Sequence, residues 1–94
     1  MLPGIALIPL GYVQVTDVSA AVALANIPAD ANFVLLEAET QDIRWRDDGI
    51  DPAAGVGMVL TKGVPFEYTG TIKKLKFIQT TATAKLNVSY YKMP

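Results

Sequence analysis

The 94-residue sequence contains neither cysteine nor histidine. Without cysteine the chain forms no disulfide and offers no thiolate nucleophile, and without both residues it lacks the usual ligands of a structural zinc site. The absence of histidine removes the side chain that most often acts as a general base. These four kinds of site are therefore excluded within this chain.

The sequence also lacks a long apolar run and a basic N-terminus. Residues 1–10 are apolar, but they include Pro3 and Pro9 and no lysine or arginine. A signal peptide begins with a positively charged region, and a membrane-spanning helix needs roughly 18–20 consecutive apolar residues. We therefore expect no targeting segment and no association with a membrane.

Charged residues are scarce as well. They make up 18% of the chain, whereas hydrophobic residues make up 51%, and an average globular domain has about 25% charged residues. A small domain has a high ratio of surface to volume, so part of this apolar material is expected on the surface, where large apolar patches mark interfaces. We therefore expect a homo-oligomer; the alternative is a core rich in small alanine side chains.

The net charge of −1 hides an asymmetry along the chain. Residues 1–51 hold eight acids and two arginines, a net −6, whereas residues 52–94 hold six lysines and one glutamate, a net +5. Such polarity can guide one subunit onto another, but pairing between neighbouring strands within one domain is the simpler interpretation. Lys73, Lys74 and Lys76 form only a small basic cluster, so we expect no nucleic-acid binding.

Apolar and polar residues alternate along most of the chain, which is the period of half-buried strands. Strands are predicted over residues 12–16, 33–40, 41–46, 57–60, 65–69, 75–80 and 84–91. The segment 41–46 is read as continuing 33–40 across a bend, and Met58 and Leu60 are expected to point inward. Regular strands separated by turns predict one all-β domain over residues 11–94, a compact antiparallel β-sandwich or small barrel.

Two segments leave alternatives open. Residues 19–25 are alanine-rich and suit a short helix, but the alternation of Ala20, Val22 and Leu24 favours a strand. Residues 1–10 are predicted to be an apolar attachment arm, because prolines fit an edge or an extended arm better than a central strand. The alternative is that these residues form the first edge strand of the domain. The arm would make contact through Leu2, Ile5, Leu7 and Ile8.

The most distinctive stretch is Arg44-Trp45-Arg46-Asp47-Asp48-Gly49. Trp45, the only tryptophan, is predicted to pack in the core or at a subunit interface, whereas Arg44 and Arg46 point to the other side. Asp47 or Glu39 would be the simplest intrachain partners of the arginines. Asp-Asp-Gly is ordinary turn chemistry, in which glycine accepts a positive φ.

No catalytic or metal site is expected in this stretch or elsewhere. Asp47, Asp48 and Asp51 offer hard oxygen ligands, but their spacing is not that of a calcium-binding loop. A pair of carboxylates for glycoside hydrolysis needs a groove between them, and a chain of this length offers little room for one. We therefore expect a protein that is not an enzyme and that uses no cofactor.

The stretch belongs to a wider pattern. Ile43 precedes it, and it is followed by Pro52, Gly57-Met58, Leu60, Gly63, Glu67-Tyr68, Gly70, Lys76-Phe77-Ile78 and Lys85-Leu86-Asn87-Val88-Ser89-Tyr90-Tyr91. Over residues 27–91 this pattern resembles small structural proteins of tailed phages and prophages. The resemblance implies a virion structural protein, in particular a capsid decoration (cement) protein that binds the major capsid protein across capsomers, commonly as a homotrimer.

The same resemblance implies synthesis in the cytoplasm of a bacterial host and a final place on the capsid surface. Two alternatives stay open. One is a tail or neck component of the same kind of phage. The other is a small carbohydrate-binding or adhesion module that uses Trp45 and Tyr91 to stack on a sugar.

Overall fold

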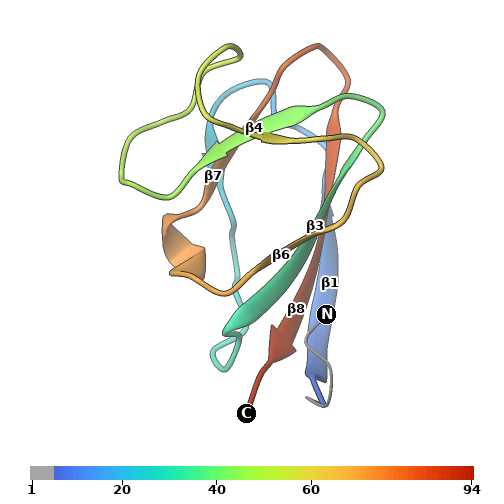
Figure 1. The fold of residues 1–94 in the computed structure, drawn as a ribbon, viewed down its shortest axis with the longest axis vertical. Helices are drawn as coiled ribbons and strands as arrows, with labels where there is room; N and C mark the ends of the chain where they lie inside the picture. The colour runs from blue at the N-terminus through green and yellow to red at the C-terminus, as the bar shows by residue number, and fades with distance from the viewer. Residues whose placement is uncertain (1–5) are drawn as a thin grey trace.

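The computed structural model describes residues 6–94 as two antiparallel four-stranded sheets packed against each other (Figure 1). We call the sheet with strand order β1-β8-β3-β6 sheet I and the sheet with order β2-β7-β4-β5 sheet II. In chain order the elements are β1 (Ile8–Val15), β2 (Val22–Ala23), β3 (Phe33–Glu39), β4 (Ile43–Arg46), β5 (Met58–Leu60), β6 (Phe66–Tyr68), the 3-10 turn η1 (Ile72–Lys74), β7 (Lys76–Gln79) and β8 (Lys85–Lys92). The predicted all-β sandwich is confirmed.

Sheet I is built around the long strand β8, which pairs with β1 on one side and with β3 on the other. Alternate residues of β8 and β3 are buried, as their period of two predicts. The core-facing residues of the two strands are Val34, Leu36, Ala38, Leu86, Val88 and Tyr90. These residues belong to the hydrophobic core.

A turn carries the chain from sheet I to sheet II between β3 and β4. Thr40 has a φ of 71° there, and its hydroxyl donates to the carbonyl oxygen of Thr83. The Asp42 carboxylate accepts the backbone N–H of Lys62 at 2.8 Å. The predicted bend in this region is therefore a change of sheet, and β4 is a new strand paired with β5 and β7.

The alanine-rich segment 19–25 contains no helix and only the two-residue strand β2, which pairs with β7. Val18, just before it, is 1% exposed, and its carbonyl oxygen accepts the backbone N–H of Gln79 at 2.9 Å. Burial and backbone pairing therefore hold this segment extended, overriding the helix propensity of alanine. Within residues 6–94 no helix has the length and apolarity needed to cross a membrane.

The boundary expected for an N-terminal arm at residue 10 is wrong. Ile8, Pro9 and Leu10 lie in β1, where Ile8 is opposite Lys92 and Pro9 is opposite Tyr91. A shift of register between Pro9 and Gly11 leaves Leu10 as the extra residue of a bulge, and Leu10 packs against the core. Leu7 is half-buried, and Leu2 and Ile5 lie outside the described residues.

Proline does not prevent strand pairing at Pro9 because β1 is an edge strand. A proline on an edge can face away from the neighbouring strand and needs no donor. The alternative expectation, a first edge strand, is therefore the correct one for Ile8–Leu10.

Candidate functional site

Strand β4 carries the first half of the distinctive motif and points Trp45 towards the other sheet. Ile43 and Trp45 are buried, whereas Arg44 and Arg46 lie on the outer side, as the alternation predicts. The Trp45 ring lies 5.5 Å from the Phe66 ring and 5.7 Å from the Tyr68 ring, measured between centroids. Both partners belong to β6 of sheet I, so this aromatic cluster joins the two sheets.

The two arginines bind partners that the sequence did not indicate. Arg44 donates from Nη1 to the carbonyl oxygen of Gly57 at 2.9 Å, and Arg46 holds Asp48 in a two-pronged ion pair whose Nε–Oδ1 distance is 3.0 Å. The expectation of Asp47 or Glu39 as partners is therefore wrong. The hydrogen bond from Arg46 lowers the pKa of Asp48, and the bond to Asp48 raises the pKa of Arg46.

Asp47 instead accepts a hydrogen bond from the Tyr68 hydroxyl, with 2.6 Å between the oxygens. Burial, together with this hydrogen bond and the charge of Asp47, raises the pKa of Tyr68 to about 12. The Tyr68 side chain also lies directly over Gly70, where a Cβ atom would come within 2.2 Å of the hydroxyl oxygen. Gly70 is therefore needed for this contact because any larger residue would displace the ring.

The loop after β4 is fixed at several points. Gly49 has a φ of 84°, as its place in an Asp-Asp-Gly turn predicts, and Asp51 forms an ion pair with Lys76 of β7 at 2.7 Å. Gly57 has a φ of 138°, and a Cβ there would lie 3.1 Å from the Trp45 carbonyl oxygen. We call residues 47–57 the motif loop; in Figure 1 it is the yellow-green segment that projects from the end of β4.

The three aspartates of the motif loop do not gather into one cluster. Among residues 6–94 no three acidic side chains come close enough together to hold a metal ion. Asp47, Asp48 and Asp51 each have a different partner within the chain: Tyr68, Arg46 and Lys76. Their charges are therefore used to hold the loop on the sandwich.

Some of the acidic residues in the first half of the sequence lie beside basic residues of the second half within the domain. Asp51 and Lys76, one from each half of the chain, form an ion pair. Glu39 of β3 lies directly opposite Lys85 of β8 in sheet I. These placements agree with acidic and basic strands lying side by side.

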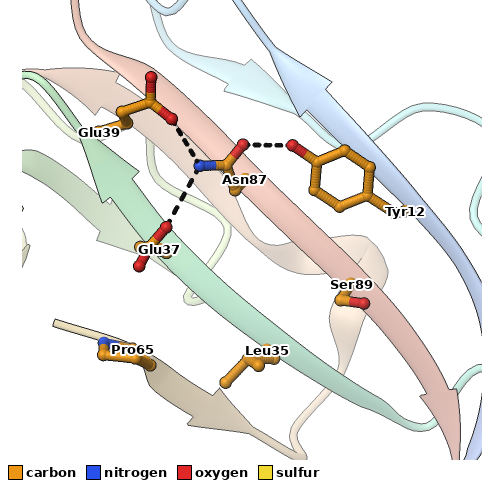
Figure 2. A pocket seen from close by; sticks show the side chains of 7 residues that line it. All are labelled: Tyr12, Leu35, Glu37, Glu39, Pro65, Asn87 and Ser89. Carbon is orange, nitrogen blue, oxygen red and sulfur yellow. Dashed lines mark hydrogen bonds between the residues drawn. The ribbon is translucent and has the colours of Figure 1, made fainter. Parts of the chain in front are cut away.

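A second candidate site lies on the outer face of sheet I, where a hollow of about 320 Å³ is lined by Tyr12, Leu35, Glu37, Glu39, Pro65, Asn87 and Ser89 (Figure 2). Asn87 is at its centre and donates from Nδ2 to Glu39 at 3.1 Å and to Glu37 at 3.4 Å. Its Oδ1 accepts the Tyr12 hydroxyl and the Gln14 amide. We call this site the outer cleft.

The ring of Tyr12 is held at the rim of the outer cleft by this network. The residue is 63% exposed, although its hydroxyl is bound to Asn87. The cleft thus combines an exposed aromatic face with carboxylate and amide groups, a mixture that suits an amphipathic ligand.

Sequence reasoning did not identify the outer cleft. Its residues come from β1, β3, β8 and the segment before β6, which are far apart in the chain. The only signal was that Tyr12, Glu37, Asn87 and Ser89 all fall on the outward side of their strands. The register of strands from opposite ends of the chain is needed to bring them together.

Trp45 and Tyr91 do not form a sugar-stacking platform. Trp45 is 9% exposed, and the Tyr91 ring packs edge-on against Phe33, with 5.7 Å between centroids. Comparison with family models, curated proteins and solved structures finds no match for this chain. The arguments about function therefore rest on the residues, on the resemblance that their pattern carries, and on their geometry.

Proposed function

We propose that this chain is a non-enzymatic structural protein of a tailed-phage virion, and specifically a capsid decoration protein that binds the major capsid protein across capsomer boundaries. It acts as a homo-oligomer, with a trimer favoured, on the capsid surface. The proposal takes its direction from the resemblance of residues 27–91 to small phage structural proteins. It requires a small, stable domain with apolar surface left over for partners.

The observation that carries the proposal is the exposure of large apolar side chains on so small a domain. Among residues 6–94, nine of them are at least 36% exposed: Ile8, Tyr12, Val13, Ile50, Val56, Met58, Val59, Val64 and Phe66. Scattered apolar residues are normal on a surface, but contiguous groups mark interfaces. An adhesive protein needs such surface, and its mechanism is the burial of apolar area on a partner.

The motif loop supports the same function in a second way. Its ion pairs and the Tyr68–Asp47 hydrogen bond hold it in one conformation on the sandwich. A loop that is already ordered loses little conformational entropy when a partner binds. Ile50 and Val56, both more than half exposed, lie in this loop and are its apolar contact residues.

Cryo-electron microscopy of the source virion tests the proposal. We expect density for the sandwich on the outside of the head, at the junctions between capsomers. Density at the tail or neck would favour the alternative structural role. Absence of the protein from purified particles, established by mass spectrometry of the same sample, would contradict both.

The outer cleft favours a second function, that of a small carbohydrate-binding module. Tyr12 offers an exposed ring on which the apolar face of a sugar can stack, and Glu37, Glu39 and Ser89 offer groups for its hydroxyls. Binding of the wild-type protein on a glycan array, lost in Tyr12→Ala and kept in Tyr91→Phe, would support it. No binding to any glycan would exclude it.

A further inference from the structure

Core-facing residues are exposed at two opposite sides of the sandwich. Sheet I ends in β1 on one side and β6 on the other, and sheet II ends in β2 and β5. We call the side formed by β1 and β2 the first edge, and the side formed by β5 and β6 the second edge.

At the first edge, Val13 shows that the sandwich is incompletely covered. It lies opposite Val88 in the core-facing register of sheet I, yet Val13 is 38% exposed whereas Val88 is fully buried. A groove of about 340 Å³ runs between β1 and β2, and its lining includes Val13, Val15, Val22, Leu24 and Tyr90. This groove is open because β2 is too short to cover β1.

The hydroxyl of Tyr90 adds a second observation at this groove. Tyr90 is 3% exposed, and its hydroxyl is buried without a hydrogen-bond partner among the described residues. Buried polar groups are nearly always paired in native proteins, so an exception calls for an explanation. Tyr90 lines the groove, so its unpaired hydroxyl marks this edge as incompletely packed.

The strand β1 itself is suited to contact with another chain. Its eight residues, Ile8–Val15, include no charged side chain. Within residues 6–94 it pairs only with β8, so its other side presents free backbone groups. Natural edge strands often carry charges, prolines or bulges that prevent such pairing. β1 carries no charge, and its proline and bulge lie in its first half, at Pro9–Gly11, which leaves Tyr12–Val15 for contact.

At the second edge, Met58 and Phe66 show the same incomplete cover. Met58 lies opposite Trp45 in sheet II, and Phe66 lies opposite Leu36 in sheet I, so both are in core-facing register. They are nevertheless 60% and 36% exposed. Met58 is on the inward side of its strand, as expected, but it is not buried. Val59 and Val64, on or beside the same strands, are also about half exposed.

We propose that the second edge of one copy of this chain docks on the first edge of another copy. Both edges expose large apolar side chains in core-facing register, and β1 and β5 carry no charged residue. The one charged residue of β6, Glu67, alternates with Phe66 and Tyr68 and therefore lies on the outer side of sheet I. The two edges lie at opposite sides of the same domain, so the contact is head-to-tail. Repetition of a head-to-tail contact closes into a ring when the rotation permits.

The proposal rests on the self-association contained in the proposed function and adds the surfaces that carry it. It does not depend on binding to a capsid. A protein that decorates heads but stays monomeric in solution would overturn this inference alone. An oligomer that is absent from virions would overturn the proposed function alone.

Charge substitutions at the two edges test the proposal by sedimentation equilibrium. We expect the wild-type protein to be oligomeric at about 100 µM, and Val13→Lys and Met58→Glu each to raise the dissociation constant by about tenfold or more, because each leaves an unpaired charge in an apolar contact. The double variant Val13→Lys/Met58→Glu should regain at least part of the loss, because each interface then holds opposite charges. Ala82→Lys, in the exposed turn between β7 and β8, is the matched control and should have no effect.

Each other outcome overturns the proposal. A dimer that is weakened by Val13→Lys, unaffected by Met58→Glu and not rescued in the double variant would show that β1 pairs with β1. A wild-type protein that is monomeric would show that neither edge binds a second copy. Thermal unfolding of every variant, with a single transition near that of the wild type, establishes that the loss of assembly is not a loss of folding.

Discussion

The motif loop and the first edge, the side of the sandwich formed by β1 and β2, differ in whether their polar groups have partners within the domain. The charged side chains of the motif loop, Asp47, Asp48 and Asp51, all have partners within the domain. The first edge has no charge, yet it has an exposed Val13 and a buried hydroxyl on Tyr90 that lacks a partner among residues 6–94. The charged side chains of the conspicuous motif therefore stabilise the fold, whereas the inconspicuous strand β1 leaves its groups unused within the described part of the chain.

The largest expected effect tests the claim that the motif around Trp45 stabilises the fold. Trp45→Ala should lower the free energy of unfolding by about 3–5 kcal/mol, because it removes a buried ring that joins the two sheets. Urea denaturation followed by far-UV circular dichroism measures the change. Tyr12→Ala, which removes an exposed aromatic ring of sheet I, is the comparison and should lower the free energy of unfolding much less. Equal losses of stability in the two variants would show that Trp45 is not a central packing residue.

A smaller effect is expected at Gly70. Gly70→Ala should cost about 1–3 kcal/mol, because its Cβ atom would displace Tyr68 and break the hydrogen bond to Asp47. Gly55→Ala is the matched control, since a Cβ there would meet nothing within 4 Å. Thermal or urea unfolding of the two variants side by side checks the difference, and an unchanged stability of Gly70→Ala would mean that the Tyr68 contact contributes nothing.

The Tyr68–Asp47 contact also predicts a dependence on alkaline pH. The pKa of Tyr68 is raised to about 12 from an ordinary value of 10.0, so the unfolded chain loses this proton at a lower pH than the folded one. The stabilisation is therefore present below pH 10 and is lost as the pH rises from 10 to 12. Tyr68→Phe should show a shallower fall of the urea midpoint over this range; an identical slope would contradict the assignment.

The smallest expected effect concerns the first edge and the unpaired hydroxyl of Tyr90. Tyr90→Phe removes a buried hydroxyl that has no partner among residues 6–94, so the free energy of unfolding of the isolated chain should change by less than about 1 kcal/mol, or rise. Urea unfolding at low protein concentration measures it. A loss of about 2 kcal/mol or more would reveal a partner for this hydroxyl and weaken the case for an open first edge.

The alternation of residues predicted much of the fold. Strands β3, β4 and β8 were expected within a residue or two of their observed limits, and the burial of Trp45 and the positive φ of Gly49 followed from local pattern alone. These features depend on near neighbours in the chain. The sandwich class followed because the strands and turns recur at regular intervals.

The sequence pattern did not predict exposure or contacts that depend on how strands distant in the sequence pair with one another. Met58 has the alternation of a core residue but lies on the edge strand β5, where 60% of it is exposed. Tyr12 meets Asn87 only because β1 pairs with β8. The partners of Arg44 and Arg46 likewise depend on the path of the motif loop, and the limit of the expected arm failed because β8 offers a partner to Ile8 and Pro9.

The molar mass of the wild-type protein in solution tests the central claim most directly, because open apolar edges without a partner should not persist. The chain has a mass of 10.1 kDa. Sedimentation equilibrium at about 100 µM should give an integral multiple of this mass, with three copies favoured by the resemblance to phage decoration proteins, and the multiple should fall towards one in Val13→Lys. A wild-type protein with the mass of a single chain would contradict the account.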